Sequence, residues 1–393
     1  MTETKAKRRS GEAHSSTSVT NALTISRRMP EFVPGMELSR SFFAEVVQPI
    51  LEDRFPSLQY AAALLGSGSE VLGYDTEMST DHGWGPRVDL FLRENEPTDL
   101  HTRIDTTLRE CLPPTFRGYS TNFGAPDRTD GGTQLPAFTE RGPINHKIEI
   151  LTAGQFFAAY LGVDVYHALE PADWLTLPEQ KLRTIASGAV FHDAIGLQGL
   201  RETLAYYPHD VWLYLLASQW VRIGQEEHLM GRAGMAGDEI GAAIIAARLV
   251  RDLMQLCFLM ERAYAPYPKW FGTAFRELAC ADELLPHLHA VLSSEAWQGR
   301  ERWLVCIYEV VAAKHNTLGI TDPLPTKVRR FFTRPFEVIA LHGYADAIAD
   351  RITDESVRRL TRRRLIGSID QFSDSTDLLS YPEFRPALKQ LYQ

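Results

Sequence analysis

Residues 64–87 read LLGSGSEVLGYDTEMSTDHGWGPR and join two segments that have the pattern of strands. Before this stretch, the apolar run 58–65 has the length of a buried strand. After it, residues 87–92 alternate between polar and apolar and indicate a second strand. Glycines, hydroxyl-bearing residues and carboxylates fill the stretch itself, which predicts a loop rich in turns rather than a core element.

The turn that leaves the first strand has the composition of a phosphate-binding loop. Gly66, Ser67 and Ser69 combine a backbone of low bulk with two hydroxyl groups. Such a turn lets N–H and O–H groups approach phosphate oxygens closely. The carboxylates that follow are of the type that holds the Mg²⁺ of a nucleoside triphosphate. The composition therefore indicates phosphoryl or nucleotidyl transfer, with Ser67 in a turn at the strand end, facing a cleft.

The same stretch resembles a known motif. Gly66-Ser67 followed by Ser79-x-Asp81 is similar to the signature of the nucleotidyltransferase (polymerase-β-like) superfamily, in which a Gly-Ser turn precedes an Asp-x-Asp pair. The longer string over 66–85 resembles an uncharacterised bacterial family grouped with that superfamily, from about residue 29 almost to the C-terminus. The expected fold class is α+β, with an N-terminal nucleotidyltransferase-type mixed sheet core followed by a larger all-helical region.

The chain departs from this motif at the second carboxylate. The resemblance places it two residues after Asp81, where Gly83 stands. Asp89 would lie roughly 26 Å from Asp81 in an extended chain, too far to share an ion unless the chain folds back. Asp75 and Glu77 have the two-residue spacing but follow the Gly-Ser turn sooner than usual. We therefore expect a damaged or rearranged metal dyad.

A further carboxylate is expected on the short strand 146–151. The resemblance implies a general base or metal ligand on a strand beside the Asp pair, and Glu149 matches by type and context. The alternative is a solvent-facing charge, because Lys147 and Glu149 share one face of the strand. We expect Asp81 and Glu149 to face each other across adjacent strands and to hold Mg²⁺, with Asp75 or Glu77 as further ligands.

Two basic residues of the helical half are candidate nucleotide ligands. Lys269 lies in the string APYPKWFG (265–272), at a helix start between aromatic residues. By analogy with other nucleotidyltransferases, in which a lysine of the helical region binds the triphosphate, Lys269 is the candidate here. Arg248 either pairs with Asp252 four residues on or meets phosphate oxygens in the cleft; the sequence leaves both open.

Composition limits the class of protein. The chain has 393 residues, 44% of them hydrophobic and 23% charged, which suits two or three packed units. Its net charge of −9 argues against a dedicated nucleic-acid binder. Four scattered cysteines without a Cys-x-x-Cys spacing favour reduced thiols and a cytoplasmic location. No window approaches the roughly 20 apolar residues that span a bilayer, so no membrane segment is expected.

Three segments are expected along the chain. Residues 1–28 are polar and are interpreted as a disordered extension. Residues 29–170 would form a nucleotidyltransferase-like α/β domain. Residues 171–393, in which apolar positions recur at helical spacing, would form a helical domain.

The leading hypothesis is a nucleotidyltransferase that binds a nucleoside triphosphate, ATP above all, with Mg²⁺ and transfers a nucleotidyl group. The acceptor is not identified by the sequence; a small molecule or a protein is favoured over RNA because the chain is acidic. The alternative is a catalytically degenerate nucleotide-binding sensor or regulatory protein, and Gly83 favours it. A pure interaction scaffold is a third reading.

Overall fold

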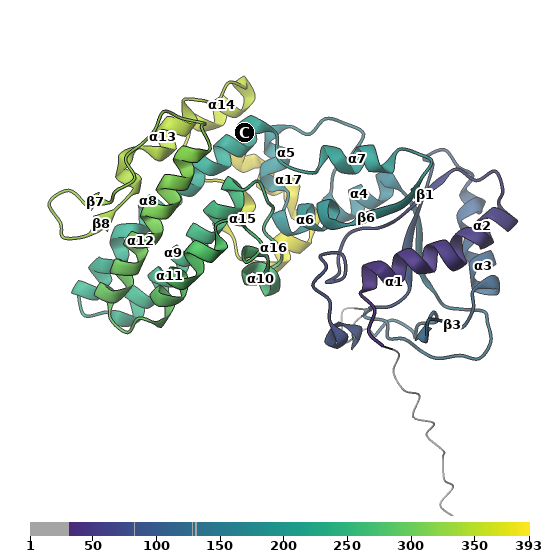
Figure 1. The fold of residues 1–393 in the computed structure, drawn as a ribbon. Coiled ribbons are helices and arrows are strands. Elements are labelled where there is room, and N and C mark those ends of the chain that lie inside the picture. Colours follow the sequence, from purple (N-terminus) through teal and green to yellow (C-terminus); the bar gives the residue numbers. More distant parts are fainter. Residues whose placement is uncertain (1–30, 82, 128, 130–131) are drawn as a thin grey trace, which may run out of the picture. The chain divides into compact units, whose positions relative to one another are not determined.

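The computed structural model describes residues 31–81, 83–127, 129 and 132–393 (Figure 1). Contacts divide the chain into residues 1–31 and a compact unit, Phe32–Gln393. The expected extension, residues 1–28, lies outside the described residues. Everything that follows concerns the compact unit.

A mixed four-stranded sheet forms the N-terminal core. Its strands are β1 (Tyr60–Leu64), β2 (Arg87–Leu92), β5 (Lys147–Thr152) and β6 (Ala189–Asp193), in the spatial order β5-β2-β1-β6. β1 is antiparallel to both β2 and β6, whereas β2 and β5 are parallel. The expected mixed sheet followed by a larger helical region is thereby confirmed. The fourth strand, β6, comes from beyond residue 170, where we placed the boundary between domains.

One face of the sheet packs against the N-terminal helices. α1 (Gly35–Phe42) continues through a π-helical turn (Phe43–Val47) into α2 (Gln48–Arg54), and α3 (Thr98–Cys111) follows β2. Leu38 of α1 and Ile104 of α3 share a buried cluster with Val88 and Leu90 of β2.

The other face of the sheet joins the core of the helical region. Ala61, Ala63 and Phe91 are buried in the same cluster as residues of α4 (Ala153–Leu161) and of the long helices beyond it. Because side chains alternate along a strand, Arg87 and Asp89 lie on this face together with Phe91. The charged residues of β2 therefore point to the side where the helical region begins.

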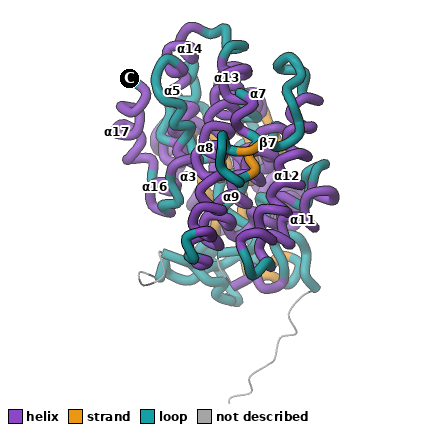
Figure 2. The backbone as a smooth tube through the Cα atoms, turned by 90° about the vertical axis from the view of Figure 1, so that its left-hand side faces the viewer, coloured by secondary structure: helices purple, strands orange, loops and turns teal. Residues whose placement is uncertain are grey.

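The helical region is built around two long antiparallel neighbours, α8 (His209–Met235) and α9 (Glu239–Met260), against which α12 (Trp297–Thr317) and α11 (Ala281–Ser293) pack (Figure 2). The shorter helices are α5 (Pro171–Thr176), α6 (Glu179–Ser187), α7 (Leu197–Thr203), α10 (Phe271–Phe275), α13 (Tyr344–Ala349), α14 (Glu355–Thr361), α15 (Ile369–Phe372), α16 (Thr376–Ser380) and α17 (Arg385–Lys389). Two-residue strands pair as β3 (Thr115–Phe116) with β4 (Tyr119–Ser120) and as β7 (Arg329–Arg330) with β8 (Glu337–Val338). None of the helices in the described part of the chain has both the length and the apolar character needed to cross a membrane.

Candidate functional site

The Gly-Ser turn lies where the sequence predicts it, directly after β1. Gly66 and Gly68 take positive φ angles of 81° and 148°, which residues with a Cβ rarely adopt. The turn is held from β2, because Nη2 of Arg87 donates to the backbone oxygen of Ser67 over 2.8 Å.

A cavity of about 710 Å³ opens at this turn. It brings together three regions that are far apart in the sequence. Its lining consists of Ser67, Gly68, Ser69, Glu70, Thr76, Met78, Ser79, Gly83, Arg87, Lys147, Lys269 and Trp270. Lys269 thus lies on the same cavity as Ser67 and Ser69, although some 200 residues separate them. We call this the turn cavity.

Arg87 is fixed within the turn cavity by a largely buried ion pair. Its Nη2 lies 2.7 Å from Oε1 of Glu70, and the side chains are only 20% and 8% exposed, respectively. The pair orients the guanidinium toward the turn. Arg87 of β2 thus contacts Ser67 and Glu70, the first and last residues of the segment 67–70, and connects both to the sheet.

Lys147 supplies a second cation from the neighbouring strand. Its Nζ donates to the backbone oxygen of Gly83 over 3.1 Å. Burial and the proximity of Arg87 lower the pKa of Lys147, whereas Glu70 and Glu149 oppose this. Gly83 has a φ of 60°, and a Cβ there would approach Nζ of Lys147 to 2.9 Å. The glycine that departs from the motif thus lies directly beside a lysine.

Lys269 completes the cationic lining from the helical region. It lies in a 3-10 turn (Pro268–Trp270), and its Nζ is 4.8 Å from the ring centroid of Trp270. Lys269 is exposed and forms no ion pair with any residue that the structure describes. The Trp270 ring lies 5.4 Å from that of Tyr74, which belongs to the loop after the Gly-Ser turn. The loop and the helical region therefore meet at Trp270.

A second cavity of about 580 Å³ adjoins the first and shares Ser67, Gly68, Ser69 and Trp270 with it. Its other lining residues are largely aromatic or hydrogen-bonding, and include Tyr160, Gln180, Lys181, Thr184, Tyr267 and Tyr381. Nζ of Lys181 donates to the backbone oxygen of Tyr160 over 2.6 Å. Burial lowers the pKa of Lys181 to about 8.

The carboxylate that faces Glu149 is Asp89, not Asp81. The parallel register of β2 and β5 pairs Asp89 with Glu149, and Arg87 with Lys147. Asp81 ends the 3-10 helix Glu77–Asp81, so the predicted arrangement of Asp81 and Glu149 across adjacent strands is wrong. The side chain of Asp81 lies outside the described part of the chain. The physical reason is local: the chain turns at Gly83 and Gly85, both at positive φ, and β2 begins only at Arg87.

The other predicted metal ligands, Asp75 and Glu77, lie in the loop between the Gly-Ser turn and β2. Oδ2 of Asp75 accepts hydrogen bonds from the Gly35 N–H over 2.7 Å and from Nε1 of Trp84 over 2.9 Å. Asp75 therefore ties the loop to α1. Glu77 is exposed at the start of its 3-10 helix.

Arg248 lies on α9 and does not line the turn cavity. Its guanidinium contacts Glu226 of α8. The expected partner, Asp252, instead binds Arg222, with Nε and Oδ1 2.7 Å apart. Both interactions join α8 to α9, so tertiary pairing replaces the i, i+4 pair that the spacing suggested.

The charges around Asp89 and Glu149 determine whether these two carboxylates suit the expected Mg²⁺. Arg87 and Lys147 precede Asp89 and Glu149 by two residues, so each carboxylate shares its strand face with a cation. Asp89 also accepts the Leu65 N–H at Oδ2 over 3.0 Å. No group of three or more His, Cys, Asp or Glu side chains among the described residues could hold a metal ion. The described side chains therefore provide no complete metal centre, and the predicted Mg²⁺ ligand Asp81, whose side chain lies outside the described residues, stays a prediction.

Asp89 is a pH-sensitive group at this site. Burial raises its pKa from the ordinary 3.8 to about 6, Glu149 and Glu70 add to the shift, and Arg87 and the Leu65 N–H oppose it. Between these two pH values the unfolded chain has lost the proton that the folded chain keeps. Stability from this group is therefore complete below pH 3.8 and is lost as the pH rises through about 6.

We expect Asp89→Asn to remove this dependence. The amide oxygen still accepts from Leu65, whereas the charge is gone. Relative to the variant, the unsubstituted chain should lose about 3 kcal/mol of unfolding free energy from acidic to neutral pH. Denaturant unfolding at several pH values measures this. Parallel pH profiles for the two chains would contradict the assignment.

Arg87, Lys147 and Asp89 were not among the predicted site residues. The signal that reveals them is the matched spacing Arg87-x-Asp89 and Lys147-x-Glu149 on two strands. Only the first of these strands follows the Gly-Ser turn. The second becomes its neighbour through tertiary pairing.

Fold and site together define an α+β protein with a cationic cavity at a Gly-Ser turn. A family model described as a domain of unknown function (DUF4037) matches residues 174–271, a segment that ends just past Lys269 and Trp270. The chain is also similar to a nucleotidyltransferase-like protein from Exiguobacterium sibiricum 255-15. That likeness has 12% identity and a TM-score of 0.32, and covers 72% of this chain and 77% of that one. No curated protein matches the chain. The family match agrees with the expected resemblance to an uncharacterised family.

Proposed function

We propose that the protein binds a nucleoside triphosphate in the turn cavity and acts as a nucleotide-binding regulatory protein. The observation that carries this proposal is the convergence of Arg87, Lys147 and Lys269 on the Ser67–Ser69 turn. Three cations from three segments, beside two hydroxyl groups, form a lining suited to an oligophosphate.

The nucleoside would occupy the adjoining cavity. Trp270 belongs to both cavities, and Tyr160 and Tyr267 add aromatic surface to the second. Aromatic rings suit stacking on a base, and Gln180 and Thr184 provide hydrogen-bonding groups for its edge. ATP is the nucleotide that we would test first.

In this proposal, cationic side chains neutralise the charge of the phosphates. A triphosphate needs positive charge around its oxygens, and a guanidinium fork supplies it with directional hydrogen bonds. Arg87 stands two residues before Asp89 on the strand face, where the first carboxylate of an Asp-x-Asp pair ending at Asp89 would stand. The proposed binding is therefore independent of Mg²⁺.

Nucleotidyl transfer is the second candidate function, and the pairing of Asp89 with Glu149 favours it. Glu149 is exposed and lies beside a buried carboxylate. In this candidate Glu149 takes the proton of an acceptor hydroxyl, whose oxygen attacks the α-phosphorus while pyrophosphate leaves. A small molecule or a protein side chain is the favoured acceptor.

Calorimetric titration with ATP, GTP, CTP and UTP, in Mg²⁺ and in EDTA, tests the proposal. We expect one nucleotide to bind with the same dissociation constant in both buffers, and no pyrophosphate release when cell extract supplies acceptors. Binding that requires Mg²⁺ would contradict the cationic cavity. Pyrophosphate release that Glu149→Gln abolishes would favour transfer. Absence of binding by all four nucleotides would refute both candidates.

A further inference from the structure

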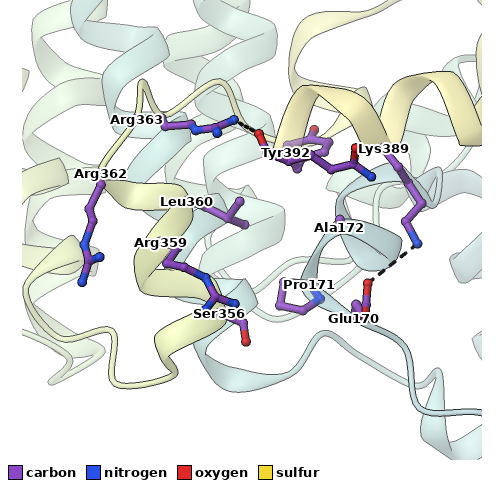
Figure 3. Close-up of a pocket in the computed structure, with 11 residues that line it drawn as sticks. Glu170, Pro171, Ala172, Ser356, Arg359, Leu360, Arg362, Arg363, Lys389 and Tyr392 are labelled. Atoms are coloured by element: carbon purple, nitrogen blue, oxygen red, sulfur yellow. Dashed lines mark hydrogen bonds and ion pairs between the residues drawn. The ribbon is translucent and has the colours of Figure 1, made fainter.

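A separate cavity of about 570 Å³ lies between α5, α14 and α17, away from the residues of the turn cavity (Figure 3). Its lining consists of Glu170, Pro171, Ala172, Ser356, Arg359, Leu360, Arg362, Arg363, Lys389, Tyr392 and Gln393. Figure 3 shows the three arginines on and just after α14 and Lys389 on the helix opposite. We call this the arginine cavity.

The arginine cavity is strongly cationic. Arg359, Arg362, Arg363 and Lys389 face a single carboxylate in the lining, that of Glu170. Counted over the lining side chains alone, four positive charges meet one negative charge, in a chain whose total is −9. Glu355 and Asp173, which pair with Arg362 and Lys389, are not part of the lining. The local charge is therefore opposite in sign to that of the whole protein.

Contacts within the protein satisfy this cluster only in part. Arg359 forms no hydrogen bond or ion pair with the described residues, and it is exposed. Arg362 lies 3.0 Å from Glu355, but both side chains are more than half exposed, at 65% and 54%. Such a pair contributes little and gives way readily to a stronger partner.

The other two cations are held by the protein's own contacts. Arg363 lies beyond α14, which ends at Thr361. Arg363 donates to the backbone oxygen of Gln393, while Nζ of Lys389 lies 2.8 Å from Oδ1 of Asp173. These contacts hold two of the four cations in place around the cavity.

We propose that the arginine cavity binds a small organic molecule carrying two phosphate groups, as a diphosphate or a bisphosphate. Each phosphate carries about −1.5 to −2 charges near pH 7, so two of them match the net charge of the lining. Arginine forks bind phosphate bidentately. Pro171, Ala172 and Leu360 form an apolar wall for the organic part. The volume lies within the usual range for small ligands.

The test uses inorganic pyrophosphate as the probe, titrated by calorimetry into the full chain. We expect Arg359→Gln/Arg362→Gln to weaken one class of pyrophosphate site at least about tenfold. Lys269→Met should leave that class unchanged, because Lys269 belongs to the turn cavity. Both replaced arginines are exposed, so the thermal midpoint of unfolding should not move.

The matched control is Arg54→Gln/Arg103→Gln, which removes the same charge from exposed arginines in the N-terminal half. It should bind pyrophosphate as the unsubstituted chain does. Equal weakening by the control, no pyrophosphate binding at all, or binding unaffected by the arginine-cavity variant would each overturn the proposal. The proposal would also be overturned if a short single-stranded RNA bound more tightly than pyrophosphate and the arginine-cavity variant lost this RNA binding.

Discussion

Arg87→Gln should lower the free energy of unfolding by about 3–5 kcal/mol, because it leaves a buried carboxylate without its partner. Glu70 is 8% exposed and lies 2.7 Å from the Arg87 guanidinium. The same change also frees the backbone oxygen of Ser67, which accepts from Arg87. The Gly-Ser turn then loses its connection to β2. Denaturant unfolding and nucleotide titration measure the two consequences.

Two further variants separate loss of the ion pair from loss of the nucleotide site. Glu70→Gln/Arg87→Gln removes both charges and should recover most of the stability, since no buried charge is left unpaired. Its affinity for nucleoside triphosphate should stay low, because the cation is still absent. Arg54→Gln is the control: its pair with Asp53 is 58% and 74% exposed. Its effect should stay below about 0.5 kcal/mol. A double variant as unstable as the single one would refute this account of Arg87.

Lys269→Met should weaken nucleoside triphosphate binding by about 1.5–3 kcal/mol, the scale of a hydrogen bond to a charged group. This corresponds to a rise in dissociation constant of about 10- to 150-fold. Lys269 is exposed on the turn cavity and forms no ion pair with the described residues, so the fold should not depend on its charge. Methionine keeps most of the apolar side chain next to Trp270. Calorimetric titration with the bound nucleotide measures the change.

Arg248→Met is the matched control for this variant. It also removes a cation from the helical region, but Arg248 contacts Glu226 and is absent from the lining of the turn cavity. We expect nucleotide affinity to stay at the value of the unsubstituted chain. If Arg248→Met weakens binding as much as Lys269→Met, the loss reflects overall charge, and Lys269 returns to the class of surface lysines.

Local sequence alone predicts the part of the fold that local interactions specify. The apolar run 58–65 is followed by the Gly66-Ser67 turn and later by the alternating run 87–92. The structure has β1, a turn and β2 at these places. Lys269 could be singled out because prolines and aromatic residues surround it in the sequence. In both cases residues that are neighbours in the chain determine the local conformation, so the sequence is sufficient to predict it.

Tertiary structure alone decided which charges meet. Glu149 was predicted on its own strand, but its partner depends on the register between β2 and β5.

 The paired residues lie 60 positions apart in the sequence, and 54 residues lie between the end of β2 and the start of β5. A register of this kind is set by packing on both faces of the sheet, which no local pattern encodes.

The same non-local pairing places the cations. Parallel register puts Lys147 beside Arg87, and the packing of the helical region brings Lys269 to the Gly-Ser turn. The sequence by itself therefore determined the strand, the turn and the candidate lysine, because each depends on residues adjacent in the chain. Only the tertiary structure decided that Asp89 faces Glu149 and that arginine and lysine surround the turn, because these contacts join segments whose approach depends on the whole core.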